Sequence, residues 1–500
     1  MIRGLLIVGM VAWTGTAFGF DTGPHFDMTR DVLTSEGFSS NAVETAQSGN
    51  YLVDFYEFMG SKGLQIALDA GCQAKEKTTL AIGDAQHFDD LENTTEVAHK
   101  WDAMLAGTKG AADSLSKAGQ IMPLMVLLGM SLHNVQDFYT HSNWVDPSPM
   151  GPGIGKGALA KYGDHPTWLS MDRAERELLD VYTRHTDPSK PPKRTHGTWE
   201  SNNNTTADSL NKDWAGRIQY TDAYICAYFA SRQWVRLFKG WVDPTVWSKM
   251  QKLTRKDYDP SRDHTAAERV SFYGGHWNGN GSGYSLSEMH SSHAAGTSLT
   301  FLINEATDYL GGTCLTKRRT KLRQQVENLL NTWGKMPYAG PVNPALPSAA
   351  PESLRFVQLK IHRIDKGTAD DGRTGGEMDW FSYSSIEGQK YMSGLIDEHD
   401  NFNFDTKPYY PWTMTKAVSP RLNSVQIGFT LMELDALDDD MVDVNPKTGD
   451  QTLVFRYDPF TGKFRGDLSG TGTLVSKGAG DGDNAQVSVG VESTVGACLK

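Results

Sequence analysis

The chain has 500 residues and a formal net charge of −12, from 48 basic and 60 acidic side chains. This length allows two or three domains with full hydrophobic cores. The acidic balance argues against tight binding to nucleic acids, because phosphate contacts need clustered lysine and arginine. The four cysteines show no CxxC spacing, which argues against a thiolate zinc site, and in an exported protein they can pair in three ways.

The first 19 residues have the features of a secretory signal peptide. Arg3 supplies the positive charge, residues 5–12 form a short apolar core, and Ala17-Phe18-Gly19 provides a cleavage site of mainly small residues. No later segment reaches the 18 or so consecutive apolar residues of a membrane-spanning helix. We therefore expect an exported protein, secreted or periplasmic, whose mature chain begins at Phe20.

The next part of the chain, residues 20–340, is predicted to be a mainly α-helical domain. Apolar residues recur at helical spacing in four segments, 25–33, 115–141, 220–238 and 322–333. A proline- and alanine-rich stretch at 341–354 then predicts a linker between two domains.

The apolar spacing changes to a period of two after the linker. Segments 357–364, 425–434 and 453–457 place their apolar residues on one face, and glycine, aspartate and proline turns lie between such segments. This pattern is typical of an antiparallel β-sandwich, which we expect over residues 355–495. The predicted fold is therefore multidomain, with a mainly α-helical domain followed by an antiparallel β-sandwich.

Segment 115–141 carries three side chains of the kind that bind metals. His133, Asp137 and His141 are at positions i, i+4 and i+8, so each is offset by only about 40° from the one before it. A single buried histidine is more often structural. Three polar side chains on one strip of an apolar helix are expensive to bury without partners or a metal.

Further ligand-type residues lie in other short motifs of the helical part. They are His25 in FDTGPH, Asp54 in NYLVDFYEF, His87 in GDAQHFDDL, and His196 with Glu200 in THGTWE. Imidazole and carboxylate ligands without thiolates suit catalytic zinc, which keeps an open position for water. A carboxylate between two histidines can also bridge two ions, an arrangement that phosphoester hydrolysis uses. His264 and Glu268 form a competing HxxxE pair.

Three of these motifs, FDTGPH, HFDDL and LHNVQDFYTHSNW, resemble the zinc-dependent phospholipase C and single-strand nuclease superfamily. The third is especially similar to the Het-C-like branch, in which a helix with histidine, aspartate and histidine ends in a Ser/Thr-Asn-aromatic turn. The resemblance covers roughly residues 20–240, and HGTWESNNNTTADSLNKDWAG is similar to another segment of that branch. It implies a secreted α-helical hydrolase with three zinc ions.

The resemblance also implies a set of ligands for each ion. The first ion would be bound by Asp54, His87, His133 and Asp137, with Asp54 also acting as general base. The second would be bound by His141, His196 and a carboxylate, either Glu200 or Asp213. The third would be bound by the amino group and carbonyl of Phe20 and by His25, and would share Asp137.

The chain departs from the family pattern in two places. Phe20 stands where the family usually has tryptophan, which matters little because the ligands there are backbone atoms. Three residues, rather than the five of the related phospholipases, separate Asp137 from His141. This shorter spacing leaves His196 with Glu200 and His264 with Glu268 as alternatives for completing the second site.

Acidic loops flank the predicted strands of the second domain. Calcium prefers oxygen ligands such as aspartate carboxylates. The candidate ligands in these loops include Asp370, Asp371, Asp379, Asp438 and Asp440. As a set they resemble the loops of PLAT-type and C-two-like sandwiches, which often follow bacterial phospholipases C. That resemblance implies calcium binding and docking on a phospholipid membrane surface.

The leading hypothesis is a zinc metallohydrolase that cleaves phosphodiester bonds, a phospholipase C acting on phosphatidylcholine-type lipids. A pocket for the choline headgroup is expected to use aromatic rings such as Phe88, Tyr139 or Trp144. One alternative is a zinc-dependent single-strand nuclease, which would need stacking aromatics beside a basic track. Another is a non-catalytic Het-C-like recognition or toxin module whose metals are structural or absent.

Overall fold

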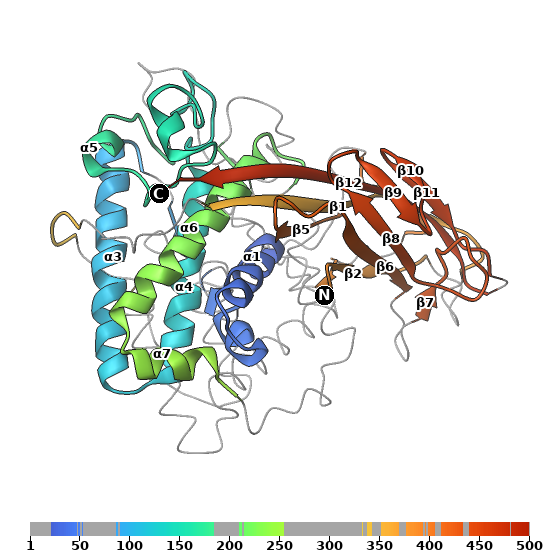
Figure 1. Cartoon of the computed structure of the whole chain (residues 1–500), viewed down its shortest axis with the longest axis horizontal. Coiled ribbons are helices and arrows are strands. Elements are labelled where there is room, and N and C mark those ends of the chain that lie inside the picture. Colours follow the sequence, from blue (N-terminus) through green and yellow to red (C-terminus); the bar gives the residue numbers. More distant parts are fainter. Residues whose placement is uncertain are drawn as a thin grey trace, which may run out of the picture.

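The computed structural model confirms the predicted fold class, with helices in the N-terminal part of the chain and antiparallel strands after residue 352 (Figure 1). The described residues are 22–47, 49–50, 53, 87–88, 91–184, 210–212, 215–254, 333, 338–342, 352–369, 377–393, 396, 399–405, 412–433, 440–480 and 482–499.

The helical part is built around one buried helix. Its elements are α1 (Thr22–Ser35), α3 (Thr94–Lys117), α4 (Ile121–His141), η1 (Gly157–Tyr162), α5 (Arg173–Arg176), α6 (Tyr220–Trp241) and α7 (Pro244–Gln251). Helix α4 contacts α1, α3, α6 and α7, and every residue from Pro123 to His141 is buried. Polar side chains on any face of α4 therefore lie inside the protein.

Segment 115–141, with its helical spacing of apolar residues, forms two helices in the structure. Helix α3 ends at Lys117 and α4 begins at Ile121, so the chain turns between them. Gly119 lies in the turn with a φ of +64°, in a backbone region that other residues rarely adopt. Pro123 lies in the first turn of α4. The backbone N–H groups of a first turn have no partner within the helix, so the missing N–H of proline costs no helical hydrogen bond.

The C-terminal part is a sandwich of two antiparallel sheets. Its strands are β1 (Glu352–Lys366), β2 (Trp380–Ile386), β3 (Gln389–Met392), β4 (Asn401–Asn403), β5 (Trp412–Val418), β6 (Val425–Glu433), β7 (Asp440–Val442), β8 (Leu453–Asp458), β9 (Lys463–Gly466), β10 (Gly470–Thr471), β11 (Leu474–Lys477) and β12 (Ala485–Cys498). One sheet has the order β11-β12-β1-β4, with β5 also paired to β1. The other has the order β10-β9-β8-β6-β2-β3, with β7 paired to β6.

The sandwich core follows the period-two pattern of the sequence. In β6, Val425, Ile427 and Phe429 are buried, while Gln426 between them is exposed. Because successive side chains of a strand point to opposite faces, this alternation places one face of the sheet in the core and the other toward solvent.

Strands β1 and β12 extend beyond the sandwich and lie against the helical part, beside α6 (Figure 1). Phe356 of β1 belongs to the helical core and lies 5.3 Å from Tyr228 and 5.9 Å from Phe229, between ring centroids. Near the end of β12, a Cβ on Gly496 would lie 2.4 Å from Cγ2 of Ile225, so only glycine allows this approach. The two parts of the protein therefore share buried surface rather than being joined only by a linker.

Polar contacts at the same junction tie α1 to the sandwich. The Tyr391 hydroxyl donates to Asp31 Oδ2 at 3.1 Å, and the Arg30 guanidinium lies 4.5 Å from the centre of the Tyr391 ring. Glu36 at the end of α1 and Glu352 of β1 both pair with Arg232 of α6, at 3.0 and 3.3 Å. Helix α1 is thus fixed by groups from both parts of the protein.

Candidate metal centre

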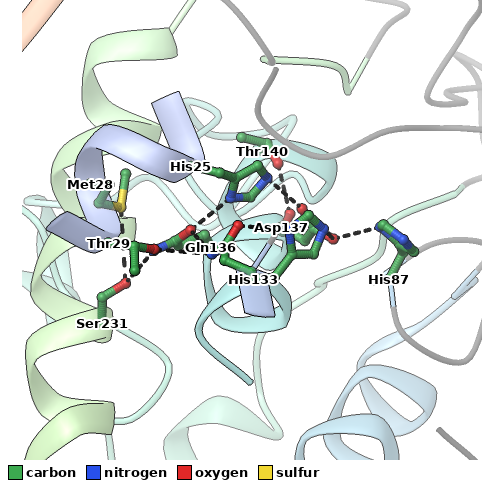
Figure 2. A network of polar contacts seen from close by, with 10 residues as sticks. His25, Met28, Thr29, His87, His133, Gln136, Asp137, Thr140 and Ser231 are labelled. Carbon is green, nitrogen blue, oxygen red and sulfur yellow. Dashed lines mark hydrogen bonds and ion pairs between the residues drawn. The ribbon is translucent and has the colours of Figure 1, made fainter. Parts of the chain in front are cut away.

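Three histidines surround the carboxylate of Asp137 in the helical part (Figure 2). His25 Nε2 lies 3.1 Å from Asp137 Oδ1, while His87 Nδ1 and His133 Nε2 lie 2.8 and 3.2 Å from Asp137 Oδ2. All four residues are buried, with exposed fractions of 0–1%. We call these residues the Asp137 cluster.

The separations within the Asp137 cluster suit a small divalent cation. The ligand atoms of His25, His133 and Asp137 all lie within 4.8 Å of one another, a group that can hold a metal ion. Zinc–ligand bonds of about 2.0–2.1 Å in tetrahedral geometry place ligand atoms about 3.3 Å apart. The nitrogen–oxygen distances of 3.1 and 3.2 Å are close to that value.

The charge states of the cluster also suit metal binding. Burial lowers the pKa of His133 to about 3, although the neighbouring Asp137 carboxylate opposes the shift. Burial alone would raise the pKa of Asp137, but the surrounding imidazoles bring that pKa well below its usual range. A neutral imidazole and a carboxylate anion are the forms in which these side chains bind metals.

Polar side chains also contact the Nδ1 atoms of His25 and His133, the ring nitrogens that do not face Asp137. His25 Nδ1 lies 2.7 Å from Gln136 Oε1, and His133 Nδ1 lies 3.2 Å from Asn50 Oδ1. The sequence analysis missed Gln136 and Asn50. A signal for Gln136 was present, because a glutamine next to Asp137 inside an apolar helix has to find buried partners.

His141 lies farther along α4, outside the group that can hold an ion. It is fully buried at the last residue of the helix. The buried Lys212 reaches the same end of α4, where its ammonium donates to the Ser142 carbonyl at 2.9 Å and lies 3.3 Å from Asp146 Oδ1. Lys212, in the described part of the asparagine–lysine segment, is therefore next to the end of the predicted ligand helix.

Most of the remaining predicted ligands lie outside the described residues. These are Phe20, Asp54, His196, Glu200, Asp213, His264 and Glu268 in the helical part and Asp370, Asp371 and Asp438 in the sandwich. Asp379 is half-buried just before β2, and Asp440 is exposed at the start of β7. In the described part of the sandwich, no three acidic or imidazole groups approach closely enough to hold an ion.

The expected aromatic headgroup pocket is wrong for the three rings named. Phe88, Tyr139 and Trp144 are fully buried, so they are part of the core. The ring of Phe88 lies 5.1 Å from that of Trp101, and the Tyr139 hydroxyl accepts a hydrogen bond from the Trp168 N–H at 2.9 Å. All three rings belong to the hydrophobic core of the helical part.

The helices of the described ranges include none that is both long enough and apolar enough to cross a membrane.

Comparisons with known proteins give only distant structural matches. No family model matches the chain, and no curated protein matches it. Alpha-toxin from an avian strain of Clostridium perfringens matches at 10% identity, over 89% of this chain and 100% of that one, with a TM-score of 0.14. A C2 domain matches at 10% identity over 28% of this chain and 98% of its own length, with a TM-score of 0.18. The first C2 domain of a plant extended synaptotagmin matches at 12% identity, over 29% and 96%, also with a TM-score of 0.18. Scores of this size carry no argument, so the function is inferred from the Asp137 cluster.

Proposed function

We propose that this protein is a zinc-dependent phosphodiesterase that acts on phospholipids, as a phospholipase C for phosphatidylcholine-type headgroups. One observation carries the proposal: the two oxygens of the Asp137 carboxylate face different histidines. Oδ1 faces His25, and Oδ2 faces His87 and His133. A carboxylate divided in this way can bridge two cations, and close pairs of cations are characteristic of phosphoester hydrolysis.

The residues of the cluster fit zinc by their chemistry. His87, His133 and Asp137 Oδ2 would bind one ion, with Asp54 as a further ligand. His25 and Asp137 Oδ1 would bind another, together with the amine and carbonyl of Phe20. The remaining ion, the second of the set implied by the sequence, would be bound by His141 with His196 and Glu200. Imidazole and carboxylate donors without thiolate are the ligand set of catalytic zinc.

The bound ions would supply a water of lowered pKa and positive charge beside the phosphoryl oxygens. The chain provides the rest of the chemistry. Asp137 supplies a buried negative charge that attracts cations, and its burial away from water strengthens that attraction. Because the pKa of His133 is lowered to about 3, its ring is neutral at pH 7, and one ring nitrogen keeps a lone pair that can bind a metal. Asp54 is proposed to accept a proton from the attacking water.

The proposal includes export from the cytoplasm and a sandwich that docks on lipid with the help of calcium at Asp370, Asp371, Asp379, Asp438 and Asp440. Contacts between the sandwich and α1 support a joint action of the two parts. Tyr391 contacts Asp31, six residues after the proposed ligand His25 on the same helix. A sandwich bound to a membrane would therefore place the cluster at a fixed position relative to that surface.

The test compares metal content and hydrolysis in two variants that carry the same substitution. Asp137→Asn removes the bridging charge, whereas Asp102→Asn changes a buried aspartate that contacts Arg173 at 3.1 Å, outside the cluster. We expect wild type and Asp102→Asn to bind zinc and to hydrolyse phosphatidylcholine vesicles, and we expect a chelator to stop the hydrolysis. Asp137→Asn should neither bind zinc nor hydrolyse the vesicles.

The substrate choice separates the other functions. Cleavage of single-stranded DNA without cleavage of vesicles would favour the nuclease. Zinc binding without hydrolysis of either substrate would favour the recognition module. Hydrolysis that survives the chelator in wild type would contradict the metal-dependent proposal altogether.

A further inference from the structure

The amide side chains of Asn50 and Gln136 connect the two stacked imidazoles of His25 and His133, whose Nε2 atoms both face Asp137. We propose that these two residues form a positioning pair, which fixes the tautomer of His25 and His133 so that each ring directs an unprotonated Nε2 at the ion that it would bind. This inference rests on the proposed metal site and concerns residues that do not themselves bind the ion.

The two amides are hydrogen-bonded to each other, so the orientation of one fixes the orientation of the other. Asn50 Nδ2 donates to Gln136 Oε1 at 3.1 Å and to Thr29 Oγ1 at 3.0 Å. Gln136 Nε2 donates to Thr29 Oγ1 at 3.2 Å and to Ser231 Oγ at 3.3 Å. If Gln136 alone were turned, its Nε2 would face the Nδ2 of Asn50, and two donors would oppose each other.

The amide orientation in turn determines the tautomer of the rings. Gln136 Oε1 and Asn50 Oδ1 are acceptors, so the ring nitrogens that face them, at 2.7 and 3.2 Å, must carry hydrogen. A neutral imidazole has only one such hydrogen. The Nε2 atoms of His25 and His133 are therefore left as lone-pair donors, directed at the Asp137 carboxylate where the ion would bind.

The backbone explains how Asn50 comes so close to α4. A Cβ on Gly129 of α4 would lie 1.9 Å from the Ala46 carbonyl oxygen and 2.9 Å from the Asn50 nitrogen. A Cβ on Gly49 would lie 2.5 Å from the Val126 carbonyl oxygen. Two glycines thus allow the segment that carries Asn50 to contact α4 backbone to backbone, which places its amide beside His133.

The pair also joins the elements that contribute the ligands. Thr29 lies on α1 with His25, and Ser231 lies on α6, so the hydrogen bonds of Gln136 connect α4 to both helices (Figure 2). Asn50, Gln136, Thr29 and Ser231 are all buried, with exposed fractions of 0–1%. Such outer partners of metal-binding histidines typically change metal affinity by about 10–100-fold when they are removed.

The experiment removes the acceptor at Gln136 and then restores it. Gln136→Met keeps the length of the side chain without an oxygen, and Gln136→Glu keeps the oxygens, which Thr29 and Ser231 can meet with their hydroxyl hydrogens. Zinc affinity is measured by competition with a chromophoric chelator. We expect Gln136→Met to weaken zinc binding by about 10–100-fold and Gln136→Glu to stay close to wild type.

A matched control and a direct readout of the tautomer complete the test. Gln233→Met removes another buried glutamine, whose amide contacts Thr167 and Cys498, and it should leave zinc affinity unchanged. Long-range ¹H–¹⁵N spectra of the zinc-free protein report which ring nitrogen carries hydrogen. We expect Nδ1–H for His25 and His133 in wild type, and a change at His25 in Gln136→Met.

The outcomes separate this inference from the proposed function. Nε2–H tautomers in wild type would overturn the positioning role whether or not zinc binds. Equal zinc affinity in wild type and a folded Gln136→Met would do the same. A wild-type protein that shows the Nδ1–H tautomers but binds no zinc would instead contradict the proposed metal site. If Gln136→Met does not fold by circular dichroism, Asn50→Leu, read by the His133 tautomer, replaces it.

Discussion

His25 of α1 and His133 of α4 lie stacked with their ring centroids 4.2 Å apart and an angle of 23° between the ring planes. Each ring directs its Nε2 at the same carboxylate, at 3.1 Å for His25 and 3.2 Å for His133. A cation placed at that carboxylate would turn the repulsion between ring lone pairs and carboxylate oxygens into attraction.

The first prediction concerns the number of ions that each side chain affects. His133→Ala should reduce the zinc bound at the Oδ2 side of Asp137, and His25→Ala should reduce the zinc at the Oδ1 side. Asp137→Asn should reduce both, because it contacts both sets of histidines. Elemental analysis of the purified variants measures the zinc-to-protein ratio. An Asp137→Asn protein with the zinc content of wild type would show that the cluster is structural.

The second prediction concerns the N-terminus. His25 lies in α1, which begins at Thr22, and the third proposed ion needs the free amine of Phe20 close to His25. A protein that keeps Gly19 or any residue before it should bind less zinc than one that begins at Phe20. Mass spectrometry of the purified protein identifies its first residue, and metal analysis of both forms measures the difference. Equal zinc in both forms would exclude the amine as a ligand.

The third prediction concerns Gly129 and the contact that it allows. Gly129→Ala should displace the segment that carries Asn50, because the added Cβ would lie 1.9 Å from the Ala46 oxygen. We expect lower thermal stability and weaker zinc binding, measured by melting temperature and chelator competition. Gly110→Ala is the control: it lies in α3 with nothing within 4 Å of the added Cβ, and should stabilise the helix by about 0.5–1 kcal/mol.

The fourth prediction concerns the shared core of the two parts. Phe356 is fully buried among aromatic rings of α6, so Phe356→Ala should cost about 3–5 kcal/mol of the free energy of unfolding. Phe460→Ala changes a ring that is 60% exposed and should cost far less. Chemical denaturation of the full chain measures both values. A helical part expressed without residues 345–500 should for the same reason be unstable; a stable and zinc-loaded fragment would contradict this.

The fifth prediction concerns pH and the sandwich. Burial alone would raise the pKa of Asp467, but hydrogen bonds from Lys447, the Val454 N–H and Asn445 lower it below its usual range. A lowered pKa in the folded state means stability that is present at neutral pH and lost as the pH falls through that pKa. Asp467→Asn should therefore lower the denaturation midpoint at pH 7, with a smaller difference at pH 3. The exposed Asp450→Asn should change neither value, and a difference independent of pH would contradict the assignment.

The sequence alone determined the features that depend on local spacing. Helical periodicity placed His133 and Asp137 one turn apart on the same helix, and the structure keeps their contact at 3.2 Å. The change to a period of two predicted the strands β1, β6 and β8. These features follow from the geometry of one helix or one strand, which the order of residues fixes without reference to the rest of the chain.

Tertiary structure decided everything that joins distant segments. No spacing rule relates His25 to Gln136, which is 111 residues away, or Asn50 to His133, and only the packing of α1, α4 and the glycine contacts brings them together. The same holds for Phe356, which the sequence assigned to a separate sandwich and the structure places against α6. An apolar pattern indicates that a face of a helix or strand is buried, but it does not indicate which element covers that face, because the hydrophobic effect is non-directional.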